Sequence, residues 1–373
     1  MKISFKNYIT RLFFIVFASS VLFSCSNDDD NGNSNGRTLI VDNSQFGIYA
    51  NKTNAEQTTK GINTAIEYAK DNGYDVVKLT RGEYLIKCMG GYGYESNKGI
   101  FMPNNLTLDM TDGVTLYVEP NSVMHKLIWI DEVENVTILG GHLIGDKDSH
   151  KLNSLTASGG NAIEINCSRN VTIQGVKMEK FTGSAMWVGY GYIAPNERRL
   201  NKNIKIQNCD ISDSWMQGIS IVHASGMEIA NNKIYGIGGV EPGCGIDIEP
   251  EADWSGAHPW KSWVENVNIH HNEFKDTKAE GVCVVNSYST DIEVADNLFD
   301  KSAIIINRDS KRIRLVRNTT KGWESYMVAR TSEDVYMPLT GPNKNNVEFA
   351  ERVANCSTMT GYITETDNYT KCD

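Results

Sequence analysis

Positive charge is scarce in this chain. Its 373 residues contain 36 Lys and Arg against 46 Asp and Glu, which gives a formal net charge of -10 at pH 7. Removal of the first 24 residues, which carry three positive charges, would change this value to -13. Because an acidic surface repels polyanions, the composition argues against nucleic acids and anionic membrane surfaces as partners.

The usual cysteine motifs of zinc proteins are absent. The eight cysteines include no CxxC pair and no Cys/His cluster at zinc-site spacing. We therefore predict no metal from such a motif and no required cofactor. Cys167 and Cys209 lie where a small apolar residue would stack in a core, and Cys356 and Cys372 could pair in an oxidising compartment.

Only one apolar run is long, and it is too short to span a membrane. It covers residues 12–23, follows three positive charges and ends in Leu22-Phe23-Ser24-Cys25. This pattern is typical of a signal peptide. The Leu-x-Ser-Cys ending resembles the lipobox of bacterial lipoproteins. The resemblance implies that residues 1–24 are removed and that Cys25 is lipidated, which would anchor the chain in the outer membrane.

The residues after Cys25 are too polar to form a core. Asp28, Asp29 and Asp30 precede a Gly/Asn-rich stretch, so we predict a flexible tether over residues 25–40. The acidic run resembles surface-export signals of some lipoproteins, and it is equally typical of a solubilising linker. Both the cell surface and the periplasmic face therefore stay open as locations.

The rest of the chain repeats short strands. Counted from first positions, the segments lie 22 to 36 residues apart, as expected for a solenoid whose coils carry loops of different length. The segments share the pattern small-apolar-x-apolar and begin at Ala162, Ala185, Gly218, Gly245, Gly281 and Ala303.

Two further strands recur in each coil, separated by Gly, Asn, Asp and Ser turns. Examples are Asn170-Val171-Thr172-Ile173 and Asn231-Asn232-Lys233-Ile234. Their period of two excludes helical repeats and predicts an all-β parallel β-helix. Helical spacing over residues 54–68 predicts a short N-terminal helix that caps the open end. We see no boundary within residues 41–373, which are predicted to form one domain.

This order of elements resembles the right-handed parallel β-helix proteins of the pectin lyase-like superfamily. The resemblance spans about residues 45–335 and includes Asn135-Val136-Thr137-Ile138-Leu139-Gly140-Gly141-His142-Leu143-Ile144-Gly145-Asp146. It implies a surface that handles polysaccharides, through a lyase, hydrolase, epimerase or depolymerase reaction. The motifs of polygalacturonases are missing. Asp247 matches an Asp of the epimerases, whereas Glu249 stands where they have His.

Carboxylates occupy alternate positions of Gly245-Ile246-Asp247-Ile248-Glu249. Side chains two residues apart in a strand point the same way and lie about 6.6 Å apart. Asp247 and Glu249 could therefore flank a glycosidic bond and act as acid and base. We assign Glu249 as the acid and Asp247 as the base.

Further residues are predicted to bind the substrate because they share this face or lie at neighbouring strand ends. Glu164, Trp187 and Ser220 share an outward ladder with Asp247. The remaining candidates lie in the following loop or at strand ends: Glu251, Trp254, His223, Tyr288, Asn307 and Arg308.

Two alternatives remain open. Asp247, Glu249, Glu251 and Asp253 could ligate calcium in a calcium-assisted polysaccharide lyase. The chain could instead be a noncatalytic glycan-binding or adhesive protein, which needs aromatic platforms but no acid pair. No feature of the sequence specifies an oligomeric interface.

Overall fold

The computed structural model describes residues 36–88, 97–151, 159–191, 199–251, 262–285, 288–306, 310–321, 327–329 and 333–336, with side chains up to residue 319. The chain divides into Met1–Asn35 and Gly36–Asp373. The predicted signal peptide, Cys25 and most of the tether lie outside the described residues. No helix within the described ranges is long and apolar enough to cross a membrane.

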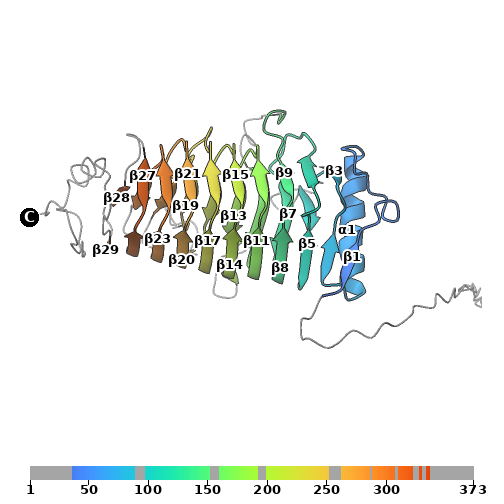
Figure 1. The fold of residues 1–373 in the computed structure, drawn as a ribbon, viewed down its shortest axis with the longest axis horizontal. Helices are drawn as coiled ribbons and strands as arrows, with labels where there is room; N and C mark the ends of the chain where they lie inside the picture. Colours follow the sequence, from blue (N-terminus) through green and yellow to red (C-terminus); the bar gives the residue numbers. More distant parts are fainter. Residues whose placement is uncertain are drawn as a thin grey trace, which may run out of the picture. The chain divides into compact units, whose positions relative to one another are not determined.

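The second unit is a parallel β-helix in which successive coils add one strand to each of three sheets (Figure 1). Sheet A contains, in spatial order, β1 (Thr38–Ile40), β2 (Val76–Lys78), β5 (Leu106–Asp109), β8 (Glu134–Leu139), β11 (Arg169–Gln174), β14 (Asn201–Gln207), β17 (Ala224–Ala230), β20 (Val264–His270), β23 (Ser289–Ala295), β26 (Lys311–Val316) and β29 (Glu333–Tyr336). Sheet B contains β3 (Gly82–Ile86), β6 (Val114–Val118), β9 (His142–Ile144), β12 (Lys177–Glu179), β15 (Asp210–Ser212), β18 (Lys233–Tyr235), β21 (Glu273–Lys275), β24 (Leu298–Asp300) and β27 (Thr319–Lys321). Sheet C contains β4 (Lys98–Phe101), β7 (Lys126–Asp131), β10 (Asn161–Asn166), β13 (Met186–Gly189), β16 (Ile219–Ile221), β19 (Ile246–Ile248), β22 (Val282–Val284), β25 (Ile304–Ile306) and β28 (Met327–Ala329).

The predicted repeat is confirmed strand by strand. All six segments with the small-apolar-x-apolar pattern lie in sheet C, and the second and third recurring strands lie in sheets A and B. Paired strands are parallel and in a register that stacks like residues, as in Val136, Val171 and Ile204. The inward positions therefore form continuous apolar columns.

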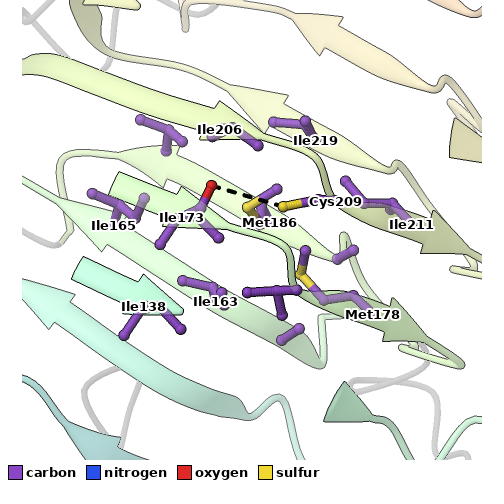
Figure 2. Close-up of a cluster of buried hydrophobic side chains, with 14 of the residues drawn as sticks. Ile138, Ile163, Ile165, Ile173, Met178, Met186, Ile206, Cys209, Ile211 and Ile219 are labelled. Atoms are coloured by element: carbon purple, nitrogen blue, oxygen red, sulfur yellow. Dashed lines mark hydrogen bonds between the residues drawn. The ribbon is translucent and has the colours of Figure 1, made fainter. Parts of the chain in front are cut away.

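The core fills the space between the three sheets. Burial of each aliphatic side chain in this core stabilises the fold by about 1.5–3 kcal/mol. Cys209 belongs to this core, as predicted, and its Sγ lies 3.8 Å from the Ile173 carbonyl oxygen. Cys167 is also buried, but it lies outside the core cluster, with its Sγ 3.4 Å from the Tyr190 carbonyl oxygen. Figure 2 shows part of the core, where inward side chains of neighbouring strands meet: Ile138, Ile163, Ile165, Ile173, Met178, Met186, Ile206, Cys209, Ile211 and Ile219.

Asparagine ladders join the turns of adjacent coils. On the surface, Asn105, Asn135, Asn170 and Asn203 have φ between 53° and 58°. The amides of Asn135, Asn170 and Asn203 each donate to the side-chain oxygen of the Asn before it, at 2.7–2.9 Å. This is the expected use of asparagine, which tolerates the left-handed conformation and hydrogen-bonds locally.

A second ladder is buried. It runs through Asn232, Asn272, Asn297 and Asn318, whose amide nitrogens lie 2.9–3.0 Å from the next side-chain oxygen. These amides also donate to backbone carbonyls of sheet A strands, such as that of Ile229. The ladder thus satisfies backbone groups that the turns would otherwise leave unpaired.

Helix α1 (Ala55–Asp71) confirms the predicted cap. Ile62, Ala65, Ile66 and Ala69 form its buried face at the i, i+3, i+4, i+7 spacing of an amphipathic helix. The helix packs against β2, β3 and β4 and so covers the first coil (Figure 1).

The solenoid begins earlier than the sequence predicts. Thr38–Ile40 forms β1, which pairs in parallel with β2. The last three residues of the predicted 25–40 tether therefore belong to sheet A. The three-residue segment has no periodicity of its own, and its conformation depends on pairing with β2.

Candidate functional site on the outer face of sheet C

The predicted outward ladder exists. Strand register joins Trp129 to Glu164, and Ser220 to Asp247, across sheet C. Because Ile246 and Ile248 lie in the core, the side chain of Asp247 between them lies on the outer face. The complete ladder is Trp129, Glu164, Trp187, Ser220, Asp247, Cys283 and Ile305.

Asp247 is buried although it faces outward. Its exposed fraction is 2%. The Gln217 side-chain amide donates to Asp247 Oδ2 at 2.9 Å, and the Ser184 hydroxyl donates to Gln217 Oε1 at 2.7 Å. Gln217 and Ser184 are themselves buried, so these hydrogen bonds fix the orientation of the Asp247 carboxyl group.

Burial, followed by the negative charges of Glu249 and Glu280, raises the pKa of Asp247 to about 7. The hydrogen bond from Gln217 opposes this shift. Asp247 therefore holds a proton over much of the neutral range. The sequence-based assignment gave the acid role to Glu249, whereas these pKa effects favour Asp247 in that role.

Glu249 lies nearer the solvent. It follows β19 directly, and its backbone N–H donates to the Ile221 carbonyl oxygen at 3.0 Å. Its half-buried side chain lines an open hollow together with Glu241, Pro242, Lys278 and Ala279. The pair thus consists of a buried protonated carboxyl group beside a carboxyl group that borders a surface hollow.

Glu164 is a separate buried acid. It is fully buried, and the amides of Asn161 and Asn166 each donate to it at 3.1 Å. Burial raises the pKa of Glu164, while the nearby charge of Lys126 lowers it. Three coil steps of about 4.8 Å separate Glu164 from Asp247, so the two acids cannot flank one glycosidic bond.

His223 packs beneath aromatic rings. Its ring is fully buried and meets Trp263 edge-on, with centroids 4.3 Å apart. His223 Nδ1 accepts a hydrogen bond from the Trp263 backbone N–H at 3.2 Å, and Tyr190 lies on another side. The side chains of His223, Glu164 and Ser220 are as buried as that of Asp247, with exposed fractions of 0%, 0% and 2%. Their role in substrate binding stays a prediction.

The other predicted binding residues are more accessible. Trp187 is half-buried, and its Nε1 lies so close to Gly189 that a Cβ there would approach to 2.3 Å. Glu251 is exposed and accepts a hydrogen bond from the Tyr190 hydroxyl, while burial, followed by Glu251 itself, raises the pKa of Tyr190. Tyr288 is half-buried, with its carbonyl oxygen bonded to the Val264 N–H. Three predicted residues lie outside the described ranges: Trp254, Asn307 and Arg308.

Ligand clusters that sequence spacing did not reveal also occur. Cys244, Glu280 and Cys283 place their ligand atoms within 4.8 Å of one another, next to Asp247 in the register. The hydrogen bond with Cys283, together with burial, raises the pKa of the Cys244 thiol. Cys244 comes from one coil and Glu280 and Cys283 come from the next. Only the spacing of the coils along the sequence could have indicated that these residues meet.

A second group consists of His125, Asp146 and His150. In the part of the chain that the structure describes, Asp247, Glu249 and Glu251 do not form a comparable group. The expected calcium cluster therefore depends on Asp253, which lies outside the described residues.

The model of one protein family, described as the right handed beta helix region, matches residues 128–320. Two Bacillus subtilis (strain 168) proteins are similar in sequence. The SPbeta prophage-derived uncharacterized protein YorA is 24% identical, covering 84% of this chain and 60% of its own length. The uncharacterized protein YclG is 30% identical, covering 68% and 45%. The chain thus spans about half the length of these relatives.

Two solved structures share the fold. The tailspike protein gp49 from Acinetobacter baumannii bacteriophage Fri1, a capsular polysaccharide depolymerase, has a TM-score of 0.54 and 14% identity, covering 89% of this chain and 63% of that one. An iota-carrageenase complexed to iota-carrageenan fragments has a TM-score of 0.52 and 14% identity, covering 75% and 57%. At this identity the likeness concerns the fold.

Proposed function

The chain belongs to the right-handed β-helix family, and from that premise we propose that it is a polysaccharide-cleaving enzyme whose acid and base are Asp247 and Glu249. The observation that carries the proposal is the pairing of a buried carboxyl group with pKa about 7 and a carboxyl group at a surface hollow. Glycosidases use two carboxyl groups in different environments for this purpose. The tailspike depolymerase and the carrageenase, which share the fold, act on polysaccharides.

The proposed reaction is hydrolysis. Asp247 donates its proton to the glycosidic oxygen as the carbon–oxygen bond breaks. Glu249, as a carboxylate, removes a proton from water, and the resulting hydroxide adds to the anomeric carbon. If Glu249 instead attacks that carbon directly, water resolves the covalent intermediate in a second step.

Gln217 fixes which oxygen of Asp247 carries the proton. Its amide N–H occupies Oδ2, so the proton is held on Oδ1. The hydroxyl of Ser184 donates to the amide oxygen of Gln217 and so sets the amide orientation. The acid is therefore positioned before substrate binds, which lowers the reorganisation needed during catalysis.

A lyase is the second candidate, and Lys278 is the observation that favours it. Lys278 lines the same hollow as Glu249, so a base and a carboxylate are available to one bound sugar. In that reaction a base removes the proton next to a uronate carboxyl group, and the glycosidic bond breaks by elimination. Calcium, if bound at Glu251 and its neighbours, would neutralise the uronate.

We further propose that Cys25 carries the lipid that anchors the enzyme to the outer membrane. The supporting observation is that, in the first 25 residues, positive charges precede an apolar run that ends in Leu-x-Ser-Cys. The acidic chain would then meet its polysaccharide at the cell surface or the periplasmic face.

The test is cleavage of a panel of neutral and acidic polysaccharides by the full-length chain, with and without a chelator. Asp247→Asn and Glu249→Gln are compared with Glu273→Gln, a carboxylate on sheet B that serves as the matched control. The proposal expects saturated products and a loss of about 10²–10⁴-fold in each site variant. Chelator-sensitive unsaturated products would identify a lyase. Binding without cleavage would identify a glycan-binding protein.

A further inference from the structure

Three buried ligand residues converge away from the proposed catalytic pair. His125 stands directly before β7, while Asp146 and His150 follow β9 in the segment that leads to β10. Their side chains have no exposed surface. Their ligand atoms lie within 4.8 Å of one another, and His125 Nε2 is 3.9 Å from Asp146 Oδ1.

Hydrogen bonds hold the outer sides of these three residues. The backbone N–H of Asn121 donates to Asp146 Oδ2 at 2.9 Å, and His150 Nδ1 donates to the same oxygen at 2.8 Å. The ring of His125 hydrogen-bonds with the backbone of Val123, and its Nδ1 lies 3.3 Å from the Asn121 amide nitrogen.

In the part of the chain that the structure describes, one polar atom of each residue has no hydrogen-bond partner. These atoms are Nε2 of His125, Oδ1 of Asp146 and Nε2 of His150, and all are buried. A buried polar atom without a partner costs about 1–3 kcal/mol, so the cluster is incompletely satisfied as it stands.

We propose that His125, Asp146 and His150 bind one divalent cation of the zinc class, each through the ligand atom that lies within 4.8 Å of the other two. Two imidazoles and one carboxylate are typical zinc ligands, whereas calcium prefers oxygen alone. The backbone N–H of Asn121, which donates to Asp146 Oδ2, orients this ligand in the way that outer hydrogen bonds do at metal sites. Water can complete the fourth position.

Gly160 leaves room for the coordinating edge of His125. A Cβ at this position would lie 2.3 Å from His125 Cε1 and 2.7 Å from Nε2. Any larger residue would displace the ring from its present place. Gly160→Ala therefore disturbs the proposed site without removing a ligand.

The cation would have a structural role. It would join His125, just before β7, to Asp146 and His150, which follow β9. The site contains neither Asp247 nor Glu249, so metal binding can be tested without any substrate. The expected readouts are metal content and thermal stability.

The test uses the full-length chain, freed of metal by a chelator and titrated with zinc in a calorimeter. We expect one zinc per chain and a higher melting temperature with zinc. His150→Ala and Gly160→Ala should weaken binding at least 10-fold. The control is His142→Ala, because His142 pairs with Glu179 on the surface of sheet B and lies outside the proposed site. It should bind as the wild type does.

Two results would overturn the proposal: no zinc binding by the wild-type chain, or equal binding by the wild type and His150→Ala. Cobalt provides a second measurement, made on the wild type and on His150→Ala. Intense visible absorption of tetrahedral cobalt in the wild type that is lost in His150→Ala supports the site. Absorption of equal intensity in both, as cobalt at Cys244, Glu280 and Cys283 would give, or only the weak absorption of octahedral cobalt in the wild type, contradicts it.

Discussion

The side-chain amide of Gln217 donates a 2.9 Å hydrogen bond to Oδ2 of Asp247, and both residues are almost completely buried. Gln217 lies two residues before β16, and β16 pairs with β19, the strand that contains Asp247. Gln217 therefore belongs to the coil next to that of the carboxyl group it orients. This contact stabilises the ionised form of Asp247 and moderates the effect of burial on its pKa.

Gln217→Leu should raise the pKa of Asp247, because it removes the one hydrogen bond that lowers it. If Asp247 is the acid, the alkaline limb of the pH–rate profile should move to higher pH, and kcat should fall because the carboxyl group is less well oriented. Ser184→Ala should produce a smaller shift in the same direction. An unchanged alkaline limb in Gln217→Leu would contradict the acid role of Asp247.

Asp247 should make the stability of the fold pH-dependent. Its pKa is raised from 3.8 to about 7, so the folded state binds the proton more tightly than the unfolded chain does. The stabilising contribution is complete below about pH 3.8 and is lost as the pH rises toward 7. Asp247→Asn should remove this loss and stabilise the fold at pH 8 by at most about 4 kcal/mol.

The measurement is denaturant unfolding of wild type and Asp247→Asn between pH 4 and 8. Glu273→Gln is the control, since it should leave the pH dependence of the wild type intact. If the free energies of unfolding of the wild type and Asp247→Asn differ by the same amount at pH 4 and pH 8, the pKa of Asp247 is not raised by folding.

The buried asparagine ladder should contribute strongly to stability. The Asn272 side chain bonds to Asn232, Asn297 and the Ile229 carbonyl, so Asn272→Ala leaves several buried groups unpaired. We expect a loss of about 2–4 kcal/mol in the free energy of unfolding. Asn266→Gly, on the surface at φ 56°, should cost less than about 1 kcal/mol. Equal losses would contradict the ladder's role.

Cys25 should be the site of lipid attachment. Expression in a Gram-negative host with a labelled fatty acid should give a labelled, membrane-bound chain, and Cys25→Ser should be unlabelled. Cys209→Ser is the control, since Cys209 lies in the core. Labelling that persists in Cys25→Ser would exclude the lipobox.

The sequence predicted the coils well because each strand repeats a local pattern. Residues such as Ile163, Ile219 and Ile246 alternate with polar ones, and the alternation alone defines which face is inside. Asn135 and Asn170 mark the turns for an equally local reason, their left-handed backbone. The register of sheet C followed, including the position of Asp247.

Burial on the outer face was not predictable in this way. Asp247 and Ser220 lie at positions that alternation assigns to solvent, yet both are almost completely buried. The meeting of His125 with Asp146 depends on the lengths of two loops rather than on any motif. These features arise from contacts between coils, which a single sequence does not reveal.

The most direct test of the central claim is cleavage of a polysaccharide substrate in water enriched in heavy oxygen, followed by mass spectrometry of the products. The account predicts one heavy oxygen at each new reducing end, with cleavage lost in both Asp247→Asn and Glu249→Gln and retained in Glu273→Gln. Products without heavy oxygen, or cleavage that survives both site substitutions, would contradict hydrolysis by this carboxyl pair.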